Sequence, residues 1–199
     1  MQNENMVEGF DLPAGKGKVI RPCAVCVMGK QQRKPFPNTG HVYPNPMSLV
    51  HLDVQGPIGG STGVEKYILV LVDEATHYTV VILTGSKAAI PDVLITALKW
   101  MGVQSGHKLQ AIRTDRGTEF LNSKVEAYLA EVGAEHQAVP AETKQQNGTA
   151  ERMNKTLVQR GRCIRLDAEL PIFTWPECVK TACDLLNPIC LQWKRSNPC

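Results

Sequence analysis

Three acidic residues, Asp53, Asp115 and Glu151, have the type and spacing to do chemistry together. Carboxylates that face one another repel, and hard divalent cations bound between them remove that repulsion. Two such ions about 3.5–4 Å apart can activate an attacking oxygen and stabilise the leaving oxygen of a phosphodiester. The chain holds 19 acidic residues, so spacing alone leaves open the alternative that each of the three is a solvated acid or a helix cap.

The elements that must position these residues follow from hydrophobic periodicity and from turn residues. Asp53 lies on the first predicted strand, Asp115 just after the fourth, and Glu151 at the start of a helix that follows a polar loop. The order predicts an α/β fold with a five-stranded mixed sheet flanked by helices. The two aspartates can meet if the first and fourth strands are neighbours. Strands are predicted over residues 48–54, 66–73, 78–84, 109–114 and 135–139, and helices over 91–101, 118–132, 150–166 and 175–186, the last ended by Asn187-Pro188.

The composition indicates a folded domain in a reducing setting. The hydrophobic fraction of 43% allows a sizeable core, and the net charge of +3 does not by itself predict a nucleic-acid partner. No secretory signal and no membrane-spanning run is visible. We therefore expect the seven cysteines to be thiols in a cytosolic or nuclear protein. Four of them, Cys163, Cys178, Cys183 and Cys190, are predicted to be small core residues.

Three segments resemble the motifs of the copia-type (Pseudoviridae) retrotransposon integrase core, a member of the retroviral integrase superfamily. They are residues 51–57 (HLDVQGP), 113–120 (RTDRGTEF) and 146–157 (QNGTAERMNKTL). Thirty-five residues separate Asp115 from Glu151, as in the D,D(35)E pattern of that family, and residues 170–187 look like the helix that follows its core. The resemblance covers roughly residues 20–190, and its most specific motif is Asn-Gly-x-Ala-Glu-Arg.

The resemblance implies an RNase H-like fold with catalytic and metal-binding roles for Asp53, Asp115 and Glu151. The metal would be two Mg²⁺ or Mn²⁺ ions. The activity would be that of a polynucleotidyl transferase or endonuclease that trims the DNA ends of an element and transfers them into target DNA. The implied partners are DNA and further copies of the chain, without a membrane. The implied location is the nucleus, with a cytoplasmic stage.

The same resemblance divides the chain and exposes departures from the family. We expect a partial zinc-module remnant and linker over residues 1–42, the catalytic core over 43–166, and a truncated helical extension over 167–199. Cys23 and Cys26 match half of a zinc site. No upstream His-His pair accompanies them, so we expect a stranded half-site without metal. Arg116 stands where the family usually has Asn. These departures lead us to expect a truncated or decayed copy.

A basic segment accompanies the third motif. Residues 144–165 hold six Lys and Arg against Glu151 alone, a balance of +6 − 1 = +5. Phosphate contacts there could hold a DNA end against the metals. An ordinary solvated helix face is the alternative. The predicted DNA-binding residues are Lys144, Gln146, Asn147, Arg152, Lys155, Gln159 and Arg162.

Three functions remain open from the sequence. The first is an integrase core. The second is another metal-dependent nuclease on the RNase H-like fold. The third is a catalytically decayed nucleic-acid-binding fragment, which the missing His pair and Arg116 favour.

Overall fold

The computed structural model describes residues 43–59, 65–115, 117–139 and 148–196, with side chains up to Asn187. Residues 39–199 form one compact unit, and all the described residues belong to it. The predictions for Cys23, Cys26, Arg116 and Cys190 and for the loop residues Lys144, Gln146 and Asn147 lie outside the described residues or side chains.

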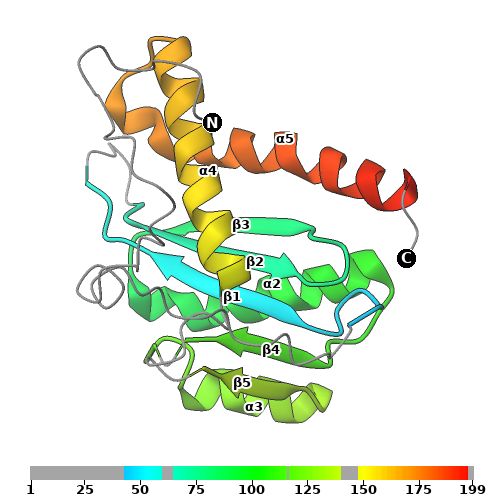
Figure 1. Ribbon diagram of the computed structural model, residues 1–199. Coiled ribbons are helices and arrows are strands. Elements are labelled where there is room, and N and C mark those ends of the chain that lie inside the picture. Colours follow the sequence, from blue (N-terminus) through cyan, green and yellow to red (C-terminus); the bar gives the residue numbers. More distant parts are fainter. Residues whose placement is uncertain (1–42, 60–64, 116, 140–147, 197–199) are drawn as a thin grey trace, which may run out of the picture. The chain divides into compact units, whose positions relative to one another are not determined.

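Five strands form one mixed sheet in the order β3-β2-β1-β4-β5 (Figure 1). β2 pairs antiparallel with β1 and β3, whereas β4 lies parallel to both β1 and β5. The predicted five-stranded mixed sheet is confirmed, and the first and fourth strands are neighbours. The strands are β1 (Val50–Gln55), β2 (Tyr67–Asp73), β3 (Thr79–Thr84), β4 (Ala111–Thr114) and β5 (Glu135–Ala138).

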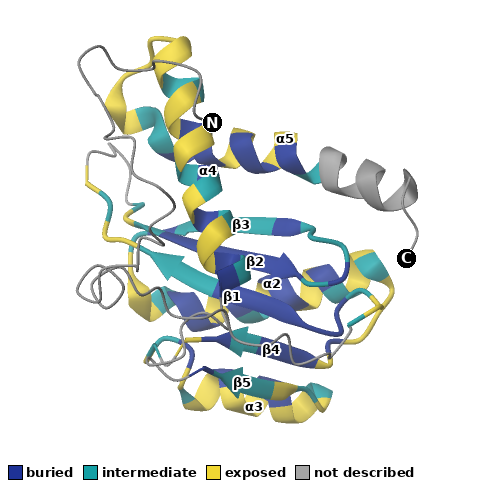
Figure 2. Ribbon diagram, viewed as in Figure 1, coloured by how far each residue is buried: buried dark blue, intermediate teal, exposed yellow. Residues whose placement is uncertain are grey.

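Helices cover both faces of this sheet. The central strand β2 is apolar at every position from Ile68 to Val72, so both of its faces must be shielded from water. Side chains alternate between faces along a strand. Leu69 and Leu71 join one core with α2 (Ile90–Ser105) and α3 (Ser123–Val132). Ile68, Val70 and Val72 join the other core with α4 (Gly148–Asp167) and α5 (Trp175–Ser196). Figure 2 shows buried residues concentrated in the central strands and on the inward sides of the helices. Two short 3-10 helices, η1 (Lys87–Ala89) and η3 (Ile172–Thr174), precede α2 and α5.

Three helix boundaries differ by four or more residues from the prediction. The helix predicted over residues 91–101 runs on to Ser105, where Gly106 caps it in the left-handed conformation. The helix predicted over residues 118–132 begins only at Ser123, because the Asn122 side chain accepts hydrogen bonds from the backbone N–H groups of Lys124 and Val125 and so forms the N-cap. The helix predicted to end at Asn187-Pro188 continues to Ser196. A proline inside a helix removes one backbone hydrogen bond, and here the helix runs on through that loss.

Asn187 fastens α5 to the edge strand β3 rather than ending a helix. Its side-chain oxygen accepts from the Thr79 N–H at 2.9 Å, and its side-chain nitrogen donates to the Thr79 carbonyl at 2.9 Å. The amide therefore completes the backbone hydrogen bonding on the outer side of β3, as a further strand would. The Cys183 thiol also donates to the Thr79 carbonyl, at 3.3 Å.

Two substitutions of Asn187 should distinguish the loss of both hydrogen bonds to Thr79 from the loss of the donated hydrogen bond alone. Asn187→Ala leaves the buried Thr79 N–H unpaired and leaves its carbonyl with the Cys183 thiol alone, so it should cost about 1–3 kcal/mol of unfolding free energy. Asn187→Asp can still accept from the N–H, but its carboxylate repels the carbonyl, so at pH 7 we expect at least the same loss. Protonation near pH 4 should restore a donor and part of the stability. Urea unfolding of both variants at pH 7 and pH 4 measures these free energies. If the unfolding free energy of both variants changes equally with pH, Asn187 does not both accept from and donate to the Thr79 backbone.

Within the described residues, no helix combines the length and the apolar character needed to cross a bilayer.

Candidate active site

Asp53 lies within β1, and Asp115 directly follows the neighbouring strand β4. The parallel register pairs Val50 with Ile112 and His51 with Arg113, and Asp115 follows two residues further along, close enough for its charge to act on Asp53. Asp53 is half-buried and Asp115 is exposed. The backbone N–H of Gly117 donates to the Asp115 carboxylate at 3.0 Å, which holds the turn that follows β4.

The side-chain nitrogen of Asn154 on α4 donates to the Asp53 carboxylate at 2.8 Å. The net effect of the surroundings is to raise the pKa of Asp53. Burial is the largest cause, and the negative charges of Asp115 and Glu119 add to it, while the hydrogen bond from Asn154 opposes the rise. Burial first, and the neighbouring acids second, thus disfavour the negative charge on Asp53, and a bound cation would offset both effects.

Glu151 reaches the same place from α4. A cleft of about 500 Å³ is lined by Asp53 and the end of β1 on one side and by one face of α4 on the other. The helix residues are Glu151, Asn154, Lys155, Val158 and Gln159, whose spacing of three and four puts them on one side of the helix. The third predicted carboxylate is thus in the cleft that Asp53 lines.

The donor atoms at this cleft fit a hard cation. Carboxylate and amide oxygens are the ligands that Mg²⁺ and Mn²⁺ take in proteins. Asn154 is 2% exposed, and its side-chain oxygen is buried without a hydrogen-bond partner beside Asp53. Among the described residues, however, no three His, Cys, Asp or Glu side chains stand close enough together to hold one ion. The structure therefore supplies the right atoms without showing a formed metal centre.

The α4 glycine Gly161 sets how closely this helix approaches α5. A Cβ atom built on Gly161 would lie 3.0 Å from a methyl group of Val179 and 3.1 Å from its backbone nitrogen. Leu157 of α4 packs in the core with Ile68, Val70 and Val72 of β2, and Asn154 lies about one turn before it on the same helix.

The predicted DNA-binding residues divide into three groups. Lys155 and Gln159 are exposed and line the cleft with Asp53 and Glu151. Arg152 and Arg162 are exposed on α4 but do not line it. The remaining predicted residues lie in the segment 140–147, outside the described residues.

Sequence reasoning missed two polar residues of this region. Asn154 stands three positions after Glu151 within a quoted motif, and that spacing was the available signal. The Glu119 side chain is only 8% exposed and pairs with Lys87 at 3.1 Å. A Cβ on Gly117 would lie 2.9 Å from a Glu119 carboxylate oxygen and 3.0 Å from one of Asp115, so both acids crowd the same glycine.

The cysteine prediction is confirmed at two positions and wrong at one. Cys178 and Cys183 are buried thiols in the part of the chain that the structure describes, whereas Cys163 is an exposed thiol. Gly161 faces α5, and a residue two positions later lies roughly 200° further round the helix. Cys163 therefore faces solvent.

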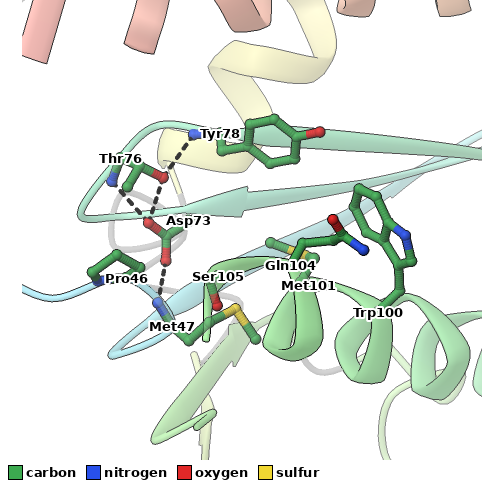
Figure 3. Close-up of a pocket in the computed structure, with 9 residues that line it drawn as sticks. All are labelled: Pro46, Met47, Asp73, Thr76, Tyr78, Trp100, Met101, Gln104 and Ser105. Atoms are coloured by element: carbon green, nitrogen blue, oxygen red, sulfur yellow. Dashed lines mark hydrogen bonds between the residues drawn. The ribbon is translucent and has the colours of Figure 1, made fainter. Parts of the chain in front are cut away.

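A second pocket, of about 340 Å³, lies between the β2–β3 hairpin and α2 (Figure 3). Its carboxylate, Asp73, is 2% exposed and accepts hydrogen bonds from the Met47 N–H and from the N–H and hydroxyl of Thr76. Trp100 and Tyr78 form apolar walls, with ring centroids 6.4 Å apart. The Asp73 carboxylate is thus occupied by hydrogen bonds that fix the start of the hairpin and tie it to Met47.

Comparison with known proteins places this geometry in a family. Residues 44–143 match the family described as Integrase core domain. The chain is 35% identical over 173 residues to the Retrovirus-related Pol polyprotein from transposon TNT 1-94 of Nicotiana tabacum, covering 86% of this chain and 13% of that protein. It is 26% identical over 165 residues to the corresponding polyprotein from transposon RE2 of Arabidopsis thaliana, covering 83% and 11%. The chain thus spans between about a ninth and an eighth of the length of these relatives.

A solved structure described as the HTLV-2 integrase catalytic core domain in complex with magnesium, in a trimeric form, has the same fold. The TM-score is 0.53 at 18% sequence identity, over 70% of this chain and 84% of that one. The sheet and its flanking helices thus form an RNase H-like fold, the fold of integrase catalytic cores. The chain belongs to the integrase core family, as a copia-type retrotransposon integrase core.

Proposed function

We propose that the chain is the catalytic core that processes the DNA ends of a retrotransposon and joins them to target DNA. The observation that supports the proposal is that Asp53 and Glu151 line one cleft, with Asp115 directly after the neighbouring strand, in a chain of the integrase core family. Asp53, Asp115 and Glu151 would hold two Mg²⁺ or Mn²⁺ ions, which when bound supply an activated attacking oxygen and charge stabilisation for the leaving oxygen.

The protein's own groups position the DNA and set the charge of the site. Asn154 orients the Asp53 carboxylate and favours its ionised form, the form that can bind a cation. Lys155 and Gln159 lie along the cleft, where an ammonium and an amide can contact phosphate or a base edge. Phosphoryl transfer is mostly positioning and charge neutralisation, so no covalent nucleophile from the chain is needed.

The remaining expectations belong to the same proposal. DNA is the partner, and self-association follows from the need to engage two ends. The location is the nucleus, with a cytoplasmic stage. The boundaries 1–42, 43–166 and 167–199 stay a prediction, as does the assignment of Cys23 and Cys26 to a half-site without zinc.

One feature of the sequence favours a different function. Arg116 brings a large cation directly after Asp115, where the family usually has Asn. A chain that keeps the fold and binds DNA but has lost catalysis would be a decayed nucleic-acid-binding fragment.

The reverse of DNA joining, in which an element end is released from joined DNA, tests the function with the fewest demands on parts of the protein outside the core. The purified chain is incubated with a branched DNA that mimics the joined product, with Mn²⁺ or Mg²⁺. Resealed target strand together with released element end supports an integrase core. Metal-dependent cutting without resealing indicates an RNase H-like nuclease instead. A folded chain that binds the branched DNA without converting it indicates the decayed fragment.

Removing the Lys155 ammonium should weaken DNA binding through phosphate. Lys155→Ala should lower affinity several-fold at low salt and reduce the slope of log affinity against log salt by about 0.9, the value for one phosphate contact on duplex DNA. Lys108→Ala is the matched control, because Lys108 is also exposed and lies before β4, at the opposite end of that strand from Asp115. Fluorescence anisotropy from 50 to 200 mM salt measures both, and identical slopes for the two variants would remove Lys155 from the interface.

A further inference from the structure

The hydroxyl of Thr114 lies between two other groups at the end of β4. Thr114 is fully buried and directly precedes Asp115. Its oxygen is 2.6 Å from the Asp115 carbonyl oxygen and 2.8 Å from Nε2 of His136 on β5. One side-chain hydroxyl thus links the backbone of Asp115 to a histidine on the neighbouring strand.

These two distances fix where the protons are. A hydroxyl carries one proton, and a carbonyl oxygen carries none. Two oxygens 2.6 Å apart need a proton between them, so the Thr114 hydroxyl donates to Asp115. His136 must then donate its Nε2 proton to the Thr114 oxygen. Burial lowers the pKa of His136, with partial opposition from Glu126, so the neutral Nε2–H tautomer is the form that satisfies both bonds.

Further contacts tie the same end of β4 to β5. The backbone N–H of Val139 donates to the Thr114 carbonyl at 2.9 Å. Thr114 and His136 lie on the sheet face that holds Ile112, the α2 and α3 side, because Ile112 pairs with His136 in register. On the other face, the Arg113 guanidinium donates from Nε and Nη2 to the side-chain oxygen of Gln137. The strand end that presents Asp115 is thus held from both faces of the sheet.

We propose that Thr114 and His136 are positioning residues for Asp115, with the His136 Nε2–H and the Thr114 hydroxyl forming a chain of hydrogen bonds that fixes the Asp115 backbone. The inference rests on the proposed function, because Asp115 matters there as a metal-binding carboxylate. Groups that orient a metal ligand typically change metal affinity by about 10–100-fold when removed.

The position of the proton on the His136 ring tests the hydrogen-bond chain, and its measurement needs no metal, no DNA and no activity assay. Nitrogen-15 and carbon-13 chemical shifts of the His136 ring should show the proton on Nε2 in the full chain at pH 7. In Thr114→Val, which keeps the side-chain shape, the ring should become a mixture of tautomers, whereas Thr114→Ser should keep the Nε2–H form. A wild-type His136 protonated on Nδ1 alone overturns the inference.

The positioning role is tested by Mn²⁺ binding, followed through the electron paramagnetic resonance signal of free Mn²⁺. Thr114→Val and His136→Leu should raise the dissociation constant roughly tenfold. Thr114→Ser and His136→Gln, which keep a hydroxyl and an N–H donor, should stay within about threefold of wild type. Ile112→Val is the control for stability alone, because Ile112 is fully buried on the same strand and bears no polar group. It should lower the melting temperature and leave Mn²⁺ affinity unchanged.

Each failure has a distinct meaning. Unchanged Mn²⁺ affinity in Thr114→Val, or an equal loss in Ile112→Val, overturns the positioning role while leaving the proposed function standing. A wild-type chain with the Nε2–H tautomer that binds no Mn²⁺ overturns the proposed function, and the positioning role with it.

Discussion

Asp115→Asn is expected to abolish the resealing of branched DNA while leaving the fold intact. Asn has the size of Asp and can still accept the hydrogen bond that the Gly117 N–H donates to Asp115, so the turn after β4 should persist. What disappears is one negative charge beside Asp53. Loss of a single group that stabilises developing charge typically costs about 10²–10³ in rate, and a metal-binding carboxylate should fall at or beyond the upper end of that range.

The matched control for this result is Asp167→Asn. Asp167 is an exposed acid at the far end of α4 and does not line the cleft. It should reseal DNA at the wild-type rate, and circular dichroism should show the same melting curve for both variants. Resealing by Asp115→Asn within tenfold of wild type would mean that the active site has been assigned to the wrong carboxylate.

Asn154→Leu should give the second large effect, a loss of roughly 10–100-fold in activity, because it removes the hydrogen bond that orients the Asp53 carboxylate. That bond favours the ionised form and lowers the pKa of Asp53, so its removal should raise this pKa further. A proton competes with a cation for the carboxylate. The acidic limb of the pH–activity profile should therefore move to higher pH.

Asn154→Asp tests the same contact by replacing the hydrogen-bond donor to Asp53 with a second acid. A second carboxylate would lie where the amide nitrogen is 2.8 Å from the Asp53 oxygen, and two carboxylates so close cannot both be ionised. Its acidic limb should move further than that of Asn154→Leu. Met153→Leu is the control, because Met153 packs in the adjacent core and the change conserves volume. A loss of activity with an unshifted profile in both Asn154 variants would show that Asn154 only supports the fold.

The sequence was sufficient for the sheet and for the elements that carry Asp53, Asp115 and Glu151, because these depend on local patterns. The short apolar run from Ile68 to Val72, rich in β-branched residues, indicates a buried strand, and Asp53 lies on a strand in which apolar and polar residues alternate. The start of α3 could not be read from hydrophobic period. Phe120 is fully buried but belongs to a turn whose N–H donates to the Gly117 carbonyl. Burial had therefore been mistaken for helical periodicity.

The supporting residues could not be predicted because their partners are distant in the chain. Asn154 contacts Asp53 across 101 positions, and His136 contacts Thr114 only because β5 pairs with β4 in one particular register. Asn187 next to Pro188 has the local signature of a helix end, yet its contact with Thr79, 108 positions away, gives it another role. Long-range pairing, and not local propensity, determines each of these contacts.

The central claim is that Asp53, Asp115 and Glu151 form one metal site, and Mn²⁺ titration of the nitrogen-15-labelled chain tests it most directly. Bound Mn²⁺ broadens the amide signals of nearby residues. The account predicts that substoichiometric Mn²⁺ first broadens Val54, Gly117 and Asn154, which come from three separate elements, and that Asp115→Asn weakens this effect. Broadening centred elsewhere, such as around His107 at the other end of β4, or none at millimolar Mn²⁺, would contradict it.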